Sequence, residues 1–103
     1  MTRFFIKWSS DYSRLPPNPL ETAKFRLKMV EMVKAELSAG RFTDWGSFSN
    51  AKDGYAIIEG SEEDVQAIML KWVPNLSYDV FPLLNADQYF ETVKRAIAAM
   101  QGK

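Results

Sequence analysis

The sequence predicts one α+β domain with the element order βαββαβ and an additional terminal helix. Four short segments rich in aromatic and β-branched residues alternate with three segments whose apolar residues recur at helical spacing. The 103 residues suffice for one two-layer core but not for two. A composition of 47% hydrophobic and 25% charged residues is typical of globular proteins. No repeat or linker interrupts the chain, so residues 1–103 are interpreted as one domain.

The first strand is expected over Arg3–Ser9. Its residues alternate with a period of two, and aromatic side chains dominate it, as is typical of strands. Its more uniformly apolar side is assigned to the helices and consists of Phe4, Ile6 and Trp8. Pro16 and Pro17 mark the loop that follows, because proline fits neither a strand ladder nor a helix interior.

A long helix is expected from Pro19 to just before Gly40. Asn18 is a favourable N-cap, proline suits the first helical position, and glycine is a common helix end. One apolar stripe is expected to face the sheet: Leu20, Ala23, Leu27, Val30, Val33 and Leu37. A second apolar stripe beside it is expected to receive the terminal helix or a partner chain, and it consists of Phe25, Met29 and Met32.

A hairpin is expected next, with strands at Trp45–Asn50 and Tyr55–Glu59. The residues Ala51–Gly54 between them contain the Asp-Gly turn signal. Ser61 is then expected to cap a second helix, whose acidic first turn suits the positive end of the helix dipole. Pro74 ends this helix, and its buried stripe consists of Val65, Ile68, Met69 and Trp72.

The last strand is expected over Leu76–Leu84, and Asn85 caps the terminal helix. Pro82 places the distal end of this strand at an edge or at a break in pairing. The apolar stripe of the terminal helix consists of Tyr89, Phe90, Val93, Ile97 and Met100. Two right-handed βαβ units in this order interleave into a ferredoxin-like, four-stranded antiparallel sheet with helices on one face.

The composition argues against several classes of function. Thirteen basic residues balance thirteen acidic ones, so there is no electrostatic reason to expect nucleic acid or an anionic membrane as partner. The sequence has no cysteine and no histidine, which excludes thiol chemistry and removes the commonest general base and metal ligand. No apolar run approaches the ~20 residues of a membrane span, and no signal-peptide pattern appears. We therefore expect a cytoplasmic protein with no metal, cofactor, nucleic-acid or membrane partner.

The sheet face that the helices leave uncovered, here called the open face, should be partly apolar. An even-length hairpin loop places seven residues there: Phe5, Lys7, Phe48, Asn50, Tyr55, Ile57 and Glu59. An odd-length loop or a bulge would move the second strand's residues to the opposite face. Such a face is too apolar to stay bare. We expect either the terminal helix or another chain to cover it; sheet-to-sheet homodimerisation would bury it and leave room for a shallow pocket between the sheet and its cover.

Four segments resemble the dimeric α/β-barrel superfamily, and in particular its small stand-alone members: Arg3–Trp8, Gly54–Glu59, Ser61–Glu63 and Val80–Leu84. The resemblance implies a homodimer whose sheets pack face to face, with a cavity between sheet and helices or inside the barrel. The superfamily includes cofactor-free monooxygenases, muconolactone-isomerase-like enzymes and ligand-sensing domains. Its haem-degrading members rely on a histidine, which this sequence lacks.

Six residues are candidate ligand-binding residues: Lys7, Asn50, Tyr55, Glu59, Trp45 and Asp79. Lys7 and Glu59 form either an acid/base pair in a cavity or a structural ion pair. Asn50 and Tyr55 either bind a ligand at the mouth of the barrel or serve the turn and cross-strand packing. Asp79 either faces the cavity or is an edge charge that discourages aggregation.

The three tryptophans either form an aromatic pocket or fill the core. A core role fits the positions of Trp8 and Trp72, whereas Trp45 starts a weak strand. Cofactor-free oxygenases of the resembled superfamily use Trp and Asn near the substrate. We therefore expect a homodimeric protein that binds a small apolar or aromatic molecule, extending to a cofactor-free enzyme of the monooxygenase or isomerase type. The alternative is a non-catalytic module whose open face serves dimerisation or protein binding.

Overall fold

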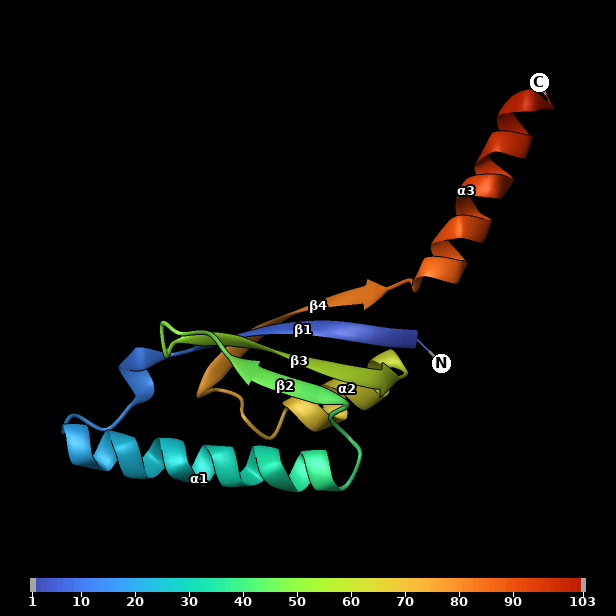
Figure 1. The fold of residues 1–103 in the computed structure, drawn as a ribbon. Coiled ribbons are helices and arrows are strands. Elements are labelled where there is room, and N and C mark those ends of the chain that lie inside the picture. Colours follow the sequence, from blue (N-terminus) through green and yellow to red (C-terminus); the bar gives the residue numbers. More distant parts are fainter. Residues whose placement is uncertain (1, 103) are drawn as a thin grey trace.

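A four-stranded sheet with two helices on one face forms the body of the protein (Figure 1). The computed structural model describes residues 2–102. Its elements in chain order are β1 (Thr2–Ser10), a 3-10 turn (Tyr12–Arg14), α1 (Pro19–Ser38), β2 (Asp44–Ser47), β3 (Asp53–Gly60), α2 (Glu62–Met69), β4 (Leu76–Leu83) and α3 (Ala86–Gln101). The predicted α+β class and order of elements are confirmed.

The strands lie in the order β2-β3-β1-β4, and every neighbouring pair is antiparallel. The central strand β1 pairs Phe5 with Ile57 of β3 on one side and with Phe81 of β4 on the other. This order is compatible with a ferredoxin-like fold. The first strand in the chain, β1, is therefore an interior strand with β3 on one side and β4 on the other.

Each helix begins at the residue that the sequence predicts. The side chain of Asn18 accepts a hydrogen bond from the Glu21 amide at 2.9 Å. Ser61 and Asn85 form capping boxes at the starts of α2 and α3. In each box, the cap side chain accepts a hydrogen bond from the backbone amide three residues later. The side chain of that later residue, Asp64 or Gln88, accepts one from the backbone amide of the cap. These caps satisfy amides that the first helical turn leaves without an intrahelical partner.

The core lies between the sheet and α2. The predicted inward set of β1 is buried, and it packs with the predicted stripe of α2. The buried core cluster consists of Phe4, Ile6, Val33, Phe42, Ala56, Ile58, Val65, Ile68, Met69 and Trp72. Only one residue of this cluster, Val33, comes from the 20-residue helix α1. The longer helix therefore contributes less to the core than the shorter one.

The open face has the composition that the alternation predicts in β1 and β3. The register puts Phe5, Lys7, Tyr55, Ile57 and Glu59 on it, together with Asp79 and Phe81 of β4. The ring of Phe5 lies 5.9 Å from that of Tyr55, nearly parallel, and 6.3 Å from that of Phe81. Three aromatic rings thus gather at the centre of this face.

The predicted hairpin turn is wrong in position. β2 ends at Ser47, so Phe48 and Asn50 lie in the connection and not on a strand, and the Asp53-Gly54 pair belongs to β3. The side chain of Asn50 makes the turn instead, by accepting hydrogen bonds from the amides of Lys52 and Asp53. Gly54 is needed in the strand, because a Cβ there would collide with the ring of Trp8.

The predicted inward stripe of α1 is also wrong for its N-terminal half. Leu20 and Leu27 are 63% and 62% exposed, and the second stripe, through Phe25 and Met29, faces the sheet instead. Both stripes are apolar, so helical spacing alone does not decide between them. The bulk of Phe25 and Met29 matches the aromatic side chains that the sheet presents to this half of the helix.

Helix α3 leaves the end of β4 and points away from the sheet (Figure 1). Its apolar stripe is therefore exposed, and α3 contains no buried residue. The described chain is accordingly elongated, with extents of 64 × 26 × 22 Å. Among residues 2–102, no helix combines the length and apolar character needed to cross a membrane.

Candidate functional site: a cavity between α1 and the sheet

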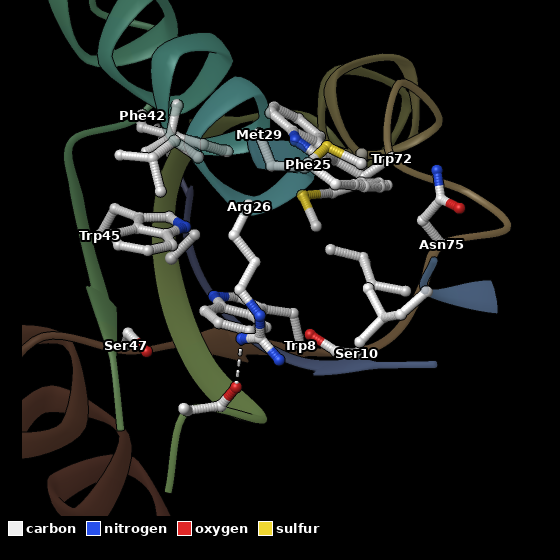
Figure 2. A pocket seen from close by; sticks show the side chains of 17 residues that line it. Trp8, Ser10, Phe25, Arg26, Met29, Phe42, Trp45, Ser47, Trp72 and Asn75 are labelled. Carbon is white, nitrogen blue, oxygen red and sulfur yellow. Dashed lines mark hydrogen bonds between the residues drawn. The ribbon is translucent and has the colours of Figure 1, made fainter. Parts of the chain in front are cut away.

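A cavity of about 320 Å³ lies between α1 and the helix-covered face of the sheet. Figure 2 shows side chains from α1, β1, β2 and the segment after α2 converging on it. Phe25 and Met29 approach from the helix, while Trp8 and Trp45 approach from the strands. The lining is mostly apolar, and its polar members are Ser10, Arg26, Ser47 and Asn75.

Two stacked aromatic pairs build the walls of the cavity. The rings of Trp8 and Trp45 lie 5.5 Å apart with 12° between their planes. In the second pair, Phe42 stacks on Trp72 at 5.5 Å and 21°. Trp8 and Trp72 are both buried, so these tryptophans serve the core and line the cavity at once. Flat walls of this kind accommodate planar rings, because aromatic groups favour offset stacking.

Arg26 links the two sides of the cavity mouth. Its Nη1 donates a hydrogen bond to the carbonyl oxygen of Ala51 at 2.7 Å, which ties α1 to the β2–β3 connection (Figure 2). Its guanidinium carbon also lies 5.6 Å from the centre of the Tyr12 ring, and Lys52 Nζ lies 5.8 Å from the same centre. Two cations, on Arg26 and Lys52, therefore lie within ~6 Å of the centre of one aromatic ring.

An ion cluster anchors α1 at its other end. Glu36, near the C-terminus of α1, is buried and accepts charge-assisted hydrogen bonds from Arg41 Nε and Lys71 Nζ. Burial raises the pKa of the Glu36 carboxyl, but the bonds from Lys71 and Arg41 outweigh it and hold the pKa below its ordinary value. The helix is thus fixed to the end of α2 by its C-terminal turn.

The open cavity follows from this unequal attachment. The C-terminal half of α1 is held close to the core by Val33 and Glu36, whereas its N-terminal half spans the large rings of Trp8 and Trp45. These rings keep the helix away from the sheet, and the side chains of Phe25 and Met29 fill only part of the gap. The gap therefore lies beneath the N-terminal half of the helix, which Arg26 ties to the β2–β3 connection without closing the space.

The cavity lies on the opposite side of the sheet from most of the predicted site residues. Of the six, only Trp45 lines it. Lys7 and Glu59 share the open face, as predicted, but the register does not bring them together. Glu59 lies opposite Arg3, whose Nε is 3.5 Å from Glu59 Oε1, and Lys7 lies between Tyr55 and Asp79.

The other predicted residues also have local partners. Asn50 donates to Asp53 in addition to making the turn. Tyr55 Oη donates to Asp44 Oδ2 at 2.7 Å, and this bond, assisted by burial, raises the pKa of Tyr55. Asp79 is exposed in β4. For these residues, a role in ligand binding stays a prediction.

Sequence reasoning missed the polar residues of the cavity. Arg26 lies on α1 between two apolar stripes, and a cation at such a position is typical of the surface of an amphipathic helix. Asn75 lies in the short connection between α2 and β4. The signal that could have located the cavity was the second apolar stripe of α1, because large side chains such as Phe25 and Met29 need an apolar surface to pack against.

The residues that line the cavity include hydrogen-bonding groups suited to binding a ligand, but few groups suited to acid–base catalysis. Among the described residues around the cavity there is no carboxylate, and the whole sequence has no histidine. The polar side-chain groups present are a guanidinium, an amide and two hydroxyls, which can form hydrogen bonds that orient a ligand.

Comparison of the sequence with protein-family models gives no match, and comparison with curated proteins also gives none.

Proposed function

We propose that this protein binds a small, planar, apolar molecule in the cavity beneath α1. The observation that carries the proposal is the cavity itself, whose volume of about 320 Å³ is lined by stacked aromatic pairs. Ligand sites in proteins commonly occupy ~300–1,000 Å³ and combine an apolar lining with a few polar groups. This cavity is at the small end of that range, which favours a ligand of one or two fused rings.

The mouth favours a ligand that carries an anionic group. Among the described residues that line the cavity, Arg26 is the only charged one, and its guanidinium forms part of the mouth. A guanidinium presents paired N–H donors that match a carboxylate. The backbone carbonyl of Ala51 is its present partner, and a carboxylate is a stronger acceptor than a carbonyl. An aromatic carboxylate therefore fits both features, because its ring can stack on the aromatic walls and its carboxylate can bind the Arg26 guanidinium.

We also propose a ferredoxin-like topology, as found in the dimeric α/β-barrel superfamily, and a homodimer that buries the open face in solution. The strand order and antiparallel pairing support the topology. The three aromatic rings on the open face support a second chain as partner, because an apolar face of this size is normally covered.

The binding test uses the three tryptophans as reporters, because all three line the cavity. We expect 2-naphthoate to shift the indole N–H signals of all three in a ¹H–¹⁵N spectrum, in a saturable way. The matched variants are V30F and L27F, which make similar changes on the same helix. Val30 lines the cavity and Leu27 is exposed on the outer side. V30F should abolish the saturable shifts and L27F should preserve them; equal responses in both variants would contradict the proposal.

A cofactor-free oxygenase is the second candidate function. The observation that favours it is the presence of Asn75 in the same cavity as the tryptophans, since Trp and Asn are the residue types that the superfamily resemblance implies near substrate. The test is oxygen uptake with an electron-rich phenol such as 1-naphthol. We expect uptake to depend on Asn75 and to fall at least tenfold in N75A. Equal rates with and without protein would leave binding as the function.

A further inference from the structure

We propose that α3 of one copy of this chain lies across the open face of the sheet of a second copy, and that the exchange is reciprocal. The inference rests on the homodimer of the proposed function and specifies its interface. It differs from a dimer in which two sheets meet directly. The cover of each sheet would then be a helix donated by the other chain.

The first observation is the exposed apolar stripe of α3. Tyr89 and Phe90 are 64% and 62% exposed, and Met100 at the far end is 73% exposed. Val93 and Ile97 complete a continuous stripe at helical spacing, while the opposite side carries Glu91 and Ala98. An amphipathic helix with no packed face is incomplete, because most helical stability in proteins comes from burying such a face.

The second observation is the apolar centre of the open face. Phe5, Tyr55 and Phe81 cluster there, and Phe81 is 49% exposed. Charged side chains surround this centre, with Arg3 and Glu59 paired at one end and Lys7 and Asp79 opposite each other at the other end. An apolar centre with a polar rim is the usual anatomy of a protein interface.

The link between β4 and α3 directs the helix away from its own sheet. Only Leu84 and Asn85 separate the two elements, and Asn85 is committed to the capping box with Gln88. Because the helix begins immediately after its cap, the connection has little freedom to reverse the chain. In Figure 1 the helix points away from its own sheet, so its stripe is available for contact with another molecule.

The two surfaces match in size. A helix of 16 residues is ~24 Å long at ~1.5 Å per residue, and strands of eight or nine residues span ~26–30 Å. Tyr89 and Phe90 alone expose roughly 200–300 Å², because they are about two-thirds exposed and large aromatic residues present ~150–250 Å² each. Two reciprocal contacts, each with two sides, therefore bury ~800–1,200 Å² through these residues, and Val93, Ile97 and Met100 bring the total into the ~1,200–2,000 Å² range of stable interfaces.

The first experiment measures the mass of the full-length chain by light scattering at micromolar concentration. We expect a dimer for the unmodified chain and a monomer for V93E, because a carboxylate at the middle of the stripe cannot be desolvated against aromatic rings. The control A98E places the same charge on the opposite side of α3 and should remain a dimer. A dimeric V93E, or a monomeric unmodified chain, would overturn the proposal.

The second experiment identifies the surface that α3 contacts. The sequence has no cysteine, so A96C introduces a single site for a nitroxide label beside the stripe. Spin-labelled chains are mixed with unlabelled ¹⁵N chains, and we expect at least twofold broadening of amides in β1 and β4 around Phe5 and Phe81. Broadening that appears only in a second sample, in which the ¹⁵N chains themselves carry the label, means that α3 covers its own sheet, and absence of broadening means a different interface; either result overturns the proposal.

The ligand site provides a check that separates this inference from the proposed function. Monomeric V93E should still show the saturable indole shifts with 2-naphthoate, because the cavity lies on the opposite side of the sheet from the open face. Loss of dimerisation with retained binding shows that the two can fail independently. If V93E loses both, with unchanged stability, the independence of site and interface is refuted.

Discussion

The indole of Trp8 stacks on that of Trp45 at 5.5 Å, and its Nε1–H donates to the carbonyl oxygen of Tyr55 at 3.2 Å. The ring lies over Gly54, where any Cβ would collide with it. The buried indole of Trp8 is thus positioned by its stack on Trp45, by its hydrogen bond to a backbone carbonyl, and by the space that the absence of a side chain at Gly54 leaves. These three contacts fix the wall of the cavity, and each is open to a mutational test.

Replacing Trp45 should lower stability and reshape the cavity. W45A removes the stacked partner of Trp8, and we expect a loss of about 2 kcal/mol in the free energy of unfolding. This is less than the ~3–5 kcal/mol of a fully buried Trp-to-Ala change, because Trp45 is half-buried. Urea denaturation provides the measurement, and W45F should retain most of the stability. An unchanged midpoint in W45A would show that the stack carries no stabilising energy.

Adding a methyl group at Gly54 should be costly. In G54A the Cβ meets both the Trp8 ring and the carbonyl of Gly46, so the ring or the strand must move. Overpacking of this kind typically costs ~1–3 kcal/mol. The control is G102A after α3, where the nearest atom to a Cβ is 3.3 Å away. Similar thermal midpoints for the two variants would contradict the role assigned to Gly54.

Local signals in the sequence predicted the elements and their caps because each depends on a few adjacent residues. Asn18, Ser61 and Asn85 cap helices as predicted. The alternation in β1 also assigned the correct faces, since strand side chains must alternate. The turn was misplaced because Asp53-Gly54 satisfies a turn equally well, and the requirement for glycine came from Trp8, distant in sequence.

The cap of α2 should contribute measurable stability. S61A removes the acceptor for the Asp64 amide at 3.1 Å and disrupts the reciprocal bond of the capping box. We expect a loss of ~1 kcal/mol, the usual effect of removing an N-cap side chain. S77A, on an exposed position of β4, is the comparison and should change stability little. A larger loss in S77A than in S61A would be inconsistent with this account.

Glu36 should make stability depend on pH. Burial raises its pKa, but the bonds from Lys71 and Arg41 lower it more, so the folded pKa lies below the unfolded one. The stabilisation is therefore fully present above the unfolded carboxyl pKa of ~4.3 and is lost as the pH falls through the folded value. E36Q should cost about 1–3 kcal/mol at pH 7 and progressively less toward pH 2.

The control for this titration is E31Q, which changes an exposed glutamate on the same helix. Its stability should follow that of the unmodified chain at every pH. Urea midpoints measured between pH 2 and pH 7 give both curves. A constant difference between E36Q and the unmodified chain across this range would show that the ion cluster does not supply the stabilisation.

The site itself was beyond prediction from the sequence because it depends on which side of α1 faces the sheet. Both stripes of this helix are apolar, and the choice between Leu27 and Met29 is made by side chains on strands far along the chain. The expected cavity could therefore lie either between the sheet and the helices or inside the barrel, and four of the six candidate residues lie on the open face. The interpretation found Trp45, whose aromatic ring is suited to either location, and missed Arg26.

The most direct test of the proposed function is the measurement of intermolecular NOEs between bound 2-naphthoate and the protein. We predict NOEs from the ligand ring protons to the methyl groups of Met29 and Val33 and to the ring of Trp45, all of which line the cavity. NOEs to Phe5, Tyr55 and Phe81 instead would place the ligand on the open face and contradict the account, as would the absence of any saturable binding.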